Sequence, residues 1–300
     1  MDFGKIDIAH IDSIPFKLPA DHPKNKDILS GKRLPRPSVY VGASGWGMKE
    51  LSGALYPRTL KSNQYLTHYS RAYKTVELSA LFYGLPAPDQ IKRWCDQTPP
   101  DFRFCPKFLQ QITHANRLIN VSEYLDLYLD CISGLGEKLG PILFMPHPSL
   151  GPKDQAQLLN FIDRLPDWVN FQIELRHPDW FMGTNHEGFF DELQKRQQSA
   201  LITDTAGRRD ALHMHLTTPH AMVRFAGYNL HPTDYQRIDD WTDRLACWIE
   251  HGLESVYFFI HQAEENLTPL LIRYFIEQLN VKARLNLSQP ILVSDQTLFG

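Results

Sequence analysis

The sequence has few cysteines and no long hydrophobic run. Its 300 residues include four cysteines, which are Cys95, Cys105, Cys131 and Cys247. None of them forms a CxxC pair, and a chain of this length needs no disulfide framework, so we expect reduced thiols. No apolar stretch approaches the roughly 20 residues that cross a bilayer, and the first residues lack the apolar segment of a signal peptide. The sequence therefore predicts a soluble, cytoplasmic protein with no membrane partner.

The chain also lacks a marked excess of charge of either sign. Its formal net charge is -3 at pH 7, which is not the basic footprint of a protein that binds duplex nucleic acid. It contains no G-x-x-x-x-G-K-[ST], G-x-G-x-x-G or G-x-S-x-G motif. These absences count against an ordinary nucleotide-binding loop and a serine hydrolase. We do not expect nucleic acid as a partner, and no cofactor is predicted.

What the sequence does contain is a series of short apolar segments typical of strands. In the clearest, at 171–175, Phe171, Ile173 and Leu175 alternate with polar residues, and Pro178 ends the element. Similar β-branched or aromatic segments recur at 39–41, 75–78, 102–105, 142–145, 200–203, 222–225 and 256–260. The sequence therefore predicts eight strands.

Segments with helical spacing of apolar residues separate these strands. One begins behind Ser122, an expected N-cap, and carries Leu125, Leu129 and Ile132 on one face. Others lie around 158–165, 238–249 and 267–275, whereas 204–222 is too polar to predict a helix. Eight buried strands, each followed by a crossover, favour an α/β fold, a single (β/α)8 TIM barrel.

The barrel is expected to be the only domain. We assign it to residues 39–280, after an irregular N-terminal extension at 1–38 that is rich in Pro, Lys and Asp. A C-terminal tail at 281–300 is expected to pack on the outside of the barrel. No internal repeat points to a second domain.

Short motifs stand in or beside the predicted strands. They include GASGW at 42–46, YP at 56–57, TVEL at 75–78, FRFCPK at 102–107, ITH at 112–114, LGP at 139–141, ELRHPDWF at 174–181 and VRF at 223–225. In this order they resemble the motifs of the YecE-like family, catalogued as domain of unknown function 72, over about residues 39–279. The resemblance implies a TIM-barrel fold, in agreement with the strand count, and it implies no reaction.

Chemistry is expected at the carboxyl ends of the strands, where parallel α/β folds carry their active sites. In a barrel, one ring there would contain Ser44, Trp46, Glu77, Lys107, His147, Glu174, Arg176, His177, Asp204, Arg224 and His261. Lys107, Arg176 and Arg224 suggest a pocket for a phosphate or carboxylate, because guanidinium groups bind oxyanions through paired hydrogen bonds. Glu174 with Arg176 could equally be a structural ion pair at the rim, and Lys107 could form a Schiff base.

The ring also supplies acids and aromatic side chains. Glu77, Glu174 and Asp204 are the candidate catalytic residues, which would transfer protons, and two of these acids could act as a pair in glycoside chemistry. Aromatic rings after strand ends could stack a sugar or base, or could plug the barrel mouth with no ligand at all. Besides the three cations, the predicted ligand contacts are Ser44, Trp46, Tyr83, His177 and Trp180.

The sequence therefore predicts an enzyme that binds a small anionic ligand, phosphorylated or polyhydroxylated, and acts by hydrolysis or isomerisation. Two alternatives stay open. His147, His177 and His261 with the acids could hold a divalent metal in a phosphodiesterase or isomerase. The barrel could also be a non-catalytic binding or scaffold protein.

Overall fold

The structure is a computed structural model that describes residues 3–296, and it shows an α/β fold with parallel sheets. All eight predicted strands are present, the sixth as two short pieces. They are β1 (Ser38–Gly42), β2 (Thr75–Leu78), β3 (Arg103–Pro106), β4 (Ile142–Phe144), β5 (Phe171–Ile173), β6 (Ser199–Ala200), β7 (Ile202–Asp204), β8 (His220–Ala226) and β9 (Ser255–His261). The outermost parts of the predicted extension and tail, residues 1–2 and 297–300, lie outside the described residues.

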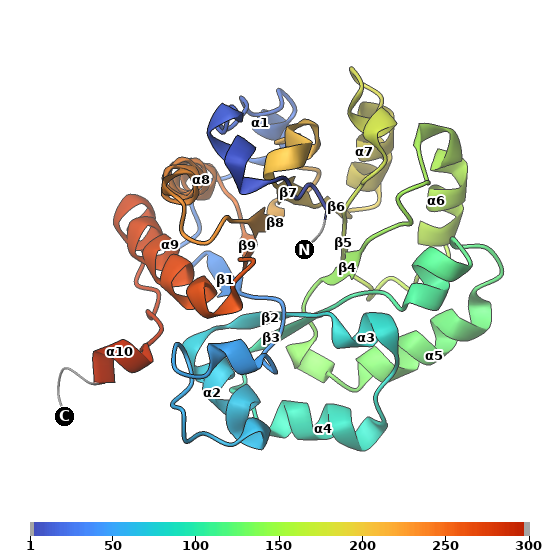
Figure 1. The fold of residues 1–300 in the computed structure, drawn as a ribbon. Helices are drawn as coiled ribbons and strands as arrows, with labels where there is room; N and C mark the ends of the chain where they lie inside the picture. The colour runs from blue at the N-terminus through green and yellow to red at the C-terminus, as the bar shows by residue number, and fades with distance from the viewer. Residues whose placement is uncertain (1–2, 297–300) are drawn as a thin grey trace.

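The strands form three parallel sheets, in the orders β1-β9-β8-β7, β2-β3 and β4-β5-β6. Backbone hydrogen bonds also link neighbouring sheets. The amide of Glu77 donates to the carbonyl of Ala43 at 3.0 Å, and the amide of Gly140 donates to the carbonyl of Phe104 at 2.8 Å. Only Leu201 separates β6 from β7. Figure 1 shows the strands in the centre of the molecule with helices around them.

The helices connect successive strands and cover their outer faces. The α-helices are α1 (Asn25–Ile28), α2 (Tyr65–Ala72), α3 (Ala80–Tyr83), α4 (Pro88–Asp96), α5 (Ser122–Ser133), α6 (Gln155–Ile162), α7 (Glu187–Lys195), α8 (Pro232–Glu250), α9 (Thr268–Ala283) and α10 (Val293–Gln296). Across residues 3–296, no helix combines the length and the apolar character needed to cross a membrane.

Apolar spacing located the long helices correctly, with one error at a helix end. Val121 occupies the N-cap position of α5, and Ser122 is the first helical residue, so the predicted Ser122 cap is wrong. The hydroxyl of Ser122 instead accepts a hydrogen bond from Nη2 of Arg164 at 2.6 Å. The polar segment after β7, where we predicted no helix, contains a short 3-10 helix, Ala206–Ala211, that is kinked at Arg208.

Side chains point alternately to the two faces of each strand, and this divides the core into an outer and an inner part. On the outer face, the ring of Phe258 stacks on Phe275 of α9 with their centroids 4.1 Å apart. On the inner face lies a separate buried cluster of Cys105, Leu143, Leu201, Met222, Tyr257 and Phe259. Since side chains two residues apart share a face, the next inner positions toward the carboxyl ends include Lys107, Thr203, Arg224 and His261. An apolar layer therefore lies beneath a polar, charged one.

The N-terminal segment reaches the carboxyl ends of β7 and β8. Residues 3–37 contain the 3-10 helix Ile8–Ser13 and helix α1. Near the start of this segment, the hydroxyl of Thr205 donates to the carbonyls of Phe3 and Gly4 at 3.2 and 2.9 Å. The dark-blue chain in Figure 1 accordingly passes over the strand ends in the middle of the molecule.

Gly42 lies at the end of β1, where this strand approaches β2. A Cβ atom at this position would lie 2.1 Å from the carbonyl oxygen of Thr75. We therefore expect Gly42→Ala to lower the free energy of unfolding, measured by urea denaturation, by roughly 1–3 kcal/mol. The control is Gly47→Ala, because within residues 3–296 no atom other than those of its chain neighbours lies within 4 Å of its Cβ position. Equal stability of the two variants would contradict the close approach of β1 and β2.

Candidate functional site

Arg224 is the centre of a buried charge network. It lies on β8, two residues beyond Met222 and on the same inner face, and only 2% of its surface is exposed. Its Nε and Nη2 donate to Oε2 and Oε1 of Glu77 at 2.9 and 3.0 Å. Its Nη1 donates to both carboxylate oxygens of Glu174 at 3.0 Å. One guanidinium group therefore joins a carboxylate on β2 to a carboxylate just beyond β5.

Glu77 has two further partners from neighbouring strands. Nζ of Lys107, which follows β3, lies 2.5 Å from Oε1 of Glu77. Nε2 of His261, at the end of β9, lies 3.2 Å from Oε2. The Glu77 side chain is fully buried, and a buried carboxylate is stable only when such partners replace its water.

Glu174 is equally buried and equally well paired. It accepts hydrogen bonds from Nε and Nη2 of Arg176 at 3.0 and 2.7 Å, so the ion pair suggested by the spacing of these two residues is present. The hydroxyl of Thr203, on β7, donates to Oε1 of Glu174 at 2.5 Å. Arg224 supplies the third partner. Strands β5, β7 and β8 thus converge on a single carboxylate.

Both carboxylates are ionised at neutral pH. Burial by itself disfavours a charge on Glu77, but Arg224 and Lys107 outweigh burial and hold the pKa of this carboxyl well below its ordinary value. Burial also opposes the charge on Glu174, yet Arg176 and Arg224 lower its pKa to about 2. Neither group can donate a proton at neutral pH, because neither carries one.

The network contains more positive than negative charge. Arg224, Arg176 and Lys107 bring three cationic groups to the two carboxylates. Burial lowers the pKa of Lys107, but the adjacent carboxylate of Glu77 opposes this effect and favours the ammonium form. His261 adds no charge at pH 7, because burial lowers the pKa of its imidazole. A cation without a full counter-charge in a poorly solvated place attracts an anionic ligand.

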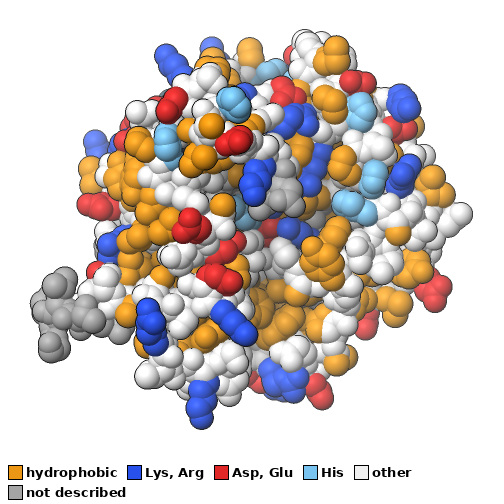
Figure 2. Space-filling view, viewed as in Figure 1, with side chains coloured by type: hydrophobic (Ala, Val, Ile, Leu, Met, Phe, Trp, Pro, Cys, Tyr) orange, Lys and Arg blue, Asp and Glu red, His pale blue; other side chains and the backbone are white. Residues whose placement is uncertain are grey.

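A pocket of about 380 Å³ opens onto this excess charge. It is lined by Phe3, Ser79, Phe82, Tyr83, Lys107, His114, Met145, Arg176 and Arg224. Of the predicted ligand contacts, the structure therefore brings together Tyr83, Lys107, Arg176 and Arg224. Figure 2 shows several Lys, Arg and His side chains near the centre of this face.

Aromatic and apolar residues that were not among the predicted ligand contacts complete the pocket. They are Phe3, Phe82, His114 and Met145. The ring of Phe82 packs edge-on against Tyr83 and His114, at 5.1 and 5.0 Å between centroids. His114 stands in the ITH motif that follows the third strand, and Phe82 lies shortly after the second strand, so their position was a usable signal. No local pattern places Phe3 at the pocket.

Asp204 does not belong to this network, and its predicted place in the ring is corrected. Its carboxylate accepts hydrogen bonds from Arg237 and from Nε1 of Trp241, both at 2.7 Å, in a separate buried cluster. The physical reason is the alternation along β7. Because Thr203 faces Glu174, the next side chain points to the opposite face of the strand.

The predicted stacking residues Trp46 and Trp180 are also corrected. Trp180 is fully buried, and its Nε1 donates to the carbonyl of Leu150 at 2.9 Å. Trp46 packs edge-on against Trp94 and Phe104, with centroids 5.4 and 6.2 Å away. Both indoles fill space between strands and their covering elements, and neither lines the pocket.

Ser44, His177 and His147 lie near strand ends but outside the pocket lining. His177 caps the amino end of the 3-10 helix Pro178–Phe181. His147 shares a hydrogen bond with the hydroxyl of Ser149 at 2.8 Å. Within residues 3–296, no three His, Cys, Asp or Glu side chains are grouped so that they could hold a metal ion.

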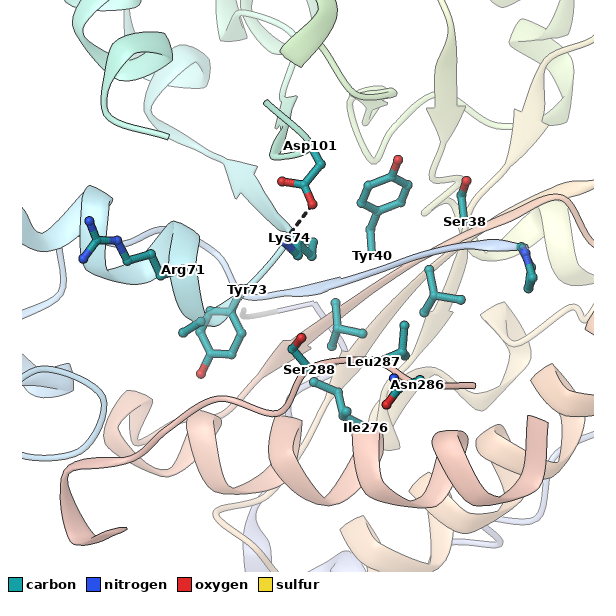
Figure 3. Close-up of a pocket in the computed structure, with 14 residues that line it drawn as sticks. Ser38, Tyr40, Arg71, Tyr73, Lys74, Asp101, Ile276, Asn286, Leu287 and Ser288 are labelled. Atoms are coloured by element: carbon teal, nitrogen blue, oxygen red, sulfur yellow. Dashed lines mark hydrogen bonds and ion pairs between the residues drawn. The ribbon is translucent and has the colours of Figure 1, made fainter. Parts of the chain in front are cut away.

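Another pocket lies at the opposite, amino ends of β1 and β2 (Figure 3). The ion pair beside it joins Lys74 to Asp101 at 2.7 Å, and these side chains are 43% and 63% exposed. Exposed pairs of this kind are well solvated and contribute little energy. We therefore place the candidate site at the carboxyl ends of the strands, over Arg224.

The fold and the pocket define an α/β protein of parallel strands with a cationic pocket at the carboxyl ends of those strands. The chain belongs to the family described as Protein of unknown function DUF72, whose model matches residues 40–294. This match confirms the resemblance carried by the sequence motifs.

Individual relatives agree with this assignment. The chain is 28% identical over 261 residues to the UPF0759 protein YecE of Escherichia coli (strain K12), covering 80% of this chain and 92% of the relative. It is 26% identical over 150 residues to the UPF0759 protein YunF of Bacillus subtilis (strain 168), covering 48% of this chain and 52% of the relative. Neither name assigns a reaction.

Solved structures of two DUF72 family proteins share the fold. The protein from Enterococcus faecalis V583 matches with a TM-score of 0.68 at 18% identity, covering 84% of this chain and 98% of that one. The protein from Thermotoga maritima MSB8 matches with a TM-score of 0.64 at 22% identity, covering 81% and 99%. At these identities, the likeness shows the fold alone.

The depressed pKa of Glu174 predicts how stability changes in acid. A carboxyl whose pKa is lower in the folded than in the unfolded state stabilises the fold above its unfolded pKa, near 4.5, and this contribution is lost as the pH falls to about 2. Between these pH values, the free energy of unfolding of the parent should fall by about 1.4 kcal/mol per pH unit more than that of the Glu174→Gln variant. Urea denaturation at each pH measures both. Parallel stability curves for the two proteins would show that Glu174 is not held ionised by its partners.

Proposed function

We propose that the pocket above Arg224 binds a small anionic ligand, phosphorylated or polyhydroxylated, and that the protein is an enzyme acting by hydrolysis or isomerisation. The excess of cations over carboxylates supports this proposal most directly. Arg176 and Lys107 are 15% and 14% exposed and line the pocket, so their charges are within reach of a ligand. The poorly solvated surroundings strengthen such a contact relative to one on the surface.

The two glutamates act in this proposal as counter-ions that position the cations. Glu174 holds the guanidinium of Arg176 through two hydrogen bonds, which fixes its plane before a ligand arrives. A fixed guanidinium binds an oxyanion with less loss of side-chain entropy than a mobile one. The same contacts occupy the carboxylate oxygens, which makes Glu77 and Glu174 poor candidates for proton transfer.

His114 is the better candidate for proton transfer. It lines the pocket, and burial together with the nearby His147 and Arg176 lowers its pKa to about 4, so the imidazole is neutral at pH 7 and, without a ligand, is a weak base. Its Nδ1 shares a hydrogen bond with the hydroxyl of Thr113 at 2.9 Å. A bound anion would raise the pKa of His114 toward the range useful for acid–base catalysis.

We also propose that the strands close into a (β/α)8 barrel. The bond from Glu77 to Ala43 puts β2 beside β1, and the bond from Gly140 to Phe104 joins the β3 side to β4. The third junction is supported by the chain itself, because β6 and β7 are consecutive and belong to different sheets. Closure would explain how side chains from β2, β5 and β8 meet around one arginine.

Arg176 allows a direct test of anion binding. We expect the parent to bind inorganic phosphate at low ionic strength and Arg176→Ala to bind it at least about tenfold more weakly, since a hydrogen-bonded charge contact is removed. Isothermal titration calorimetry measures both affinities. The matched control is Arg164→Ala, which removes an exposed arginine bonded to Ser122 and should bind like the parent. No phosphate binding by the parent, or equal binding by all three proteins, would refute the proposed function.

A further inference from the structure

The N-terminal segment forms part of the wall of the candidate pocket. The ring of Phe3 lies beneath the guanidinium carbons of Arg176 and Arg208, which are 4.8 and 5.0 Å from its centroid, and Phe3 lines the pocket itself. Such contacts between a cation and an aromatic face are attractive. The family match begins at residue 40, so this wall is supplied by a part of the chain outside the matched region.

Backbone contacts seat this segment in one position. The carbonyl of Gly4 accepts hydrogen bonds from the amide of Gly207 at 2.8 Å and from the hydroxyl of Thr205 at 2.9 Å. A little farther on, the amide of Ile6 donates to the hydroxyl of Tyr228 at 3.0 Å. Gly4 has a φ of +69°, and a Cβ atom there would lie 2.3 Å from Cγ2 of Thr205. Any other residue at this position would displace either the segment or the Thr205 side chain that holds the Gly4 carbonyl.

A second aromatic group lines the same pocket. Tyr83 is 72% exposed, and its ring meets Phe82, which in turn meets His114. Met145 adds a further apolar surface. The pocket therefore combines a cationic base with aromatic and apolar walls, whereas inorganic phosphate would use the base alone. A flat apolar group attached to the anion would remove these walls from water.

We infer that the ligand is an organic anion that carries a flat, unsaturated ring, and that Phe3 and Tyr83 determine the preference for this ring. This inference rests on the proposed function, because the anionic group of the ligand would bind Arg176 and Lys107. The ring lies against Phe3 from the N-terminal segment and against Phe82 and Tyr83 from helix α3, which follows β2. The N-terminal segment is thus a specificity-determining part of the site.

Phenyl phosphate and methyl phosphate are suitable probes, because they share the anionic group and differ in the ring. Isothermal titration calorimetry should show phenyl phosphate binding roughly tenfold or more tightly than methyl phosphate to the parent. Phe3→Ala and Tyr83→Ala should each reduce this ratio to about threefold or less. The affinity of each variant for methyl phosphate is the reference for its own ratio, so an effect of the substitution on Arg176 itself, which packs against Phe3, does not alter the conclusion.

Two control variants separate the contribution of Phe3 and Tyr83 from other effects. Ile8→Ala changes an exposed residue of the same segment, and Tyr124→Ala changes an exposed tyrosine on α5; both should keep the parental ratio. Gly4→Ala should lower the ratio as Phe3→Ala does, because it displaces the segment.

The possible results distinguish this inference from the proposed function. If the parent binds methyl phosphate and phenyl phosphate equally, the ring preference is wrong and anion binding stands. If Phe3→Ala binds phenyl phosphate more tightly than the parent, Phe3 blocks the pocket and the inference is overturned. If the parent binds neither probe, both the inference and the proposed function fail.

Discussion

The arrangement of the site depends on one guanidinium group, that of Arg224, which is shared by Glu77 and Glu174. Removing one partner from such a buried network leaves an uncompensated charge, at a cost of about 3–5 kcal/mol. The three residues come from β2, β8 and the end of β5, so the network is satisfied only when these strands face one another. The apolar layer beneath it, which includes Met222 and Phe259, keeps water from the lower side of the charges.

The same pairing leaves charge available for a ligand. Glu77 and Glu174 satisfy Arg224 from both sides, and the remaining cations, Arg176 and Lys107, each keep part of their surface toward the pocket. The carboxylates stay ionised because these cations outweigh burial. In the proposed function, the glutamates therefore hold the cations in place, and the neutral His114 is the candidate for proton transfer. A purely structural ion pair would not require three cations beside a pocket.

Sequence periodicity predicted the strands well, and it also predicted that Glu174 and Arg176 share one side of the chain. Periodicity failed to predict the direction of a side chain where a shift of one position along the strand changes the face to which it points. Thr203 faces the network while Asp204 faces Arg237, and a shift of one position along a strand reverses the two faces. The prediction that Trp180 contacts the ligand failed for a related reason. Beyond the end of a strand, successive side chains no longer point alternately to its two faces. The direction of the Trp180 side chain is set by the space between neighbouring elements.

The sequence by itself determined the order of strands and helices, the residues that form the core, and the types of charged residue at the strand ends. These properties follow from local periodicity and from the chemistry of single side chains. Only the tertiary structure decided that Arg224 joins Glu77 to Glu174, that Asp204 is excluded, and that Phe3 reaches Arg176. Such contacts join residues distant along the chain, and they depend on how the elements pack in space, which no local pattern encodes.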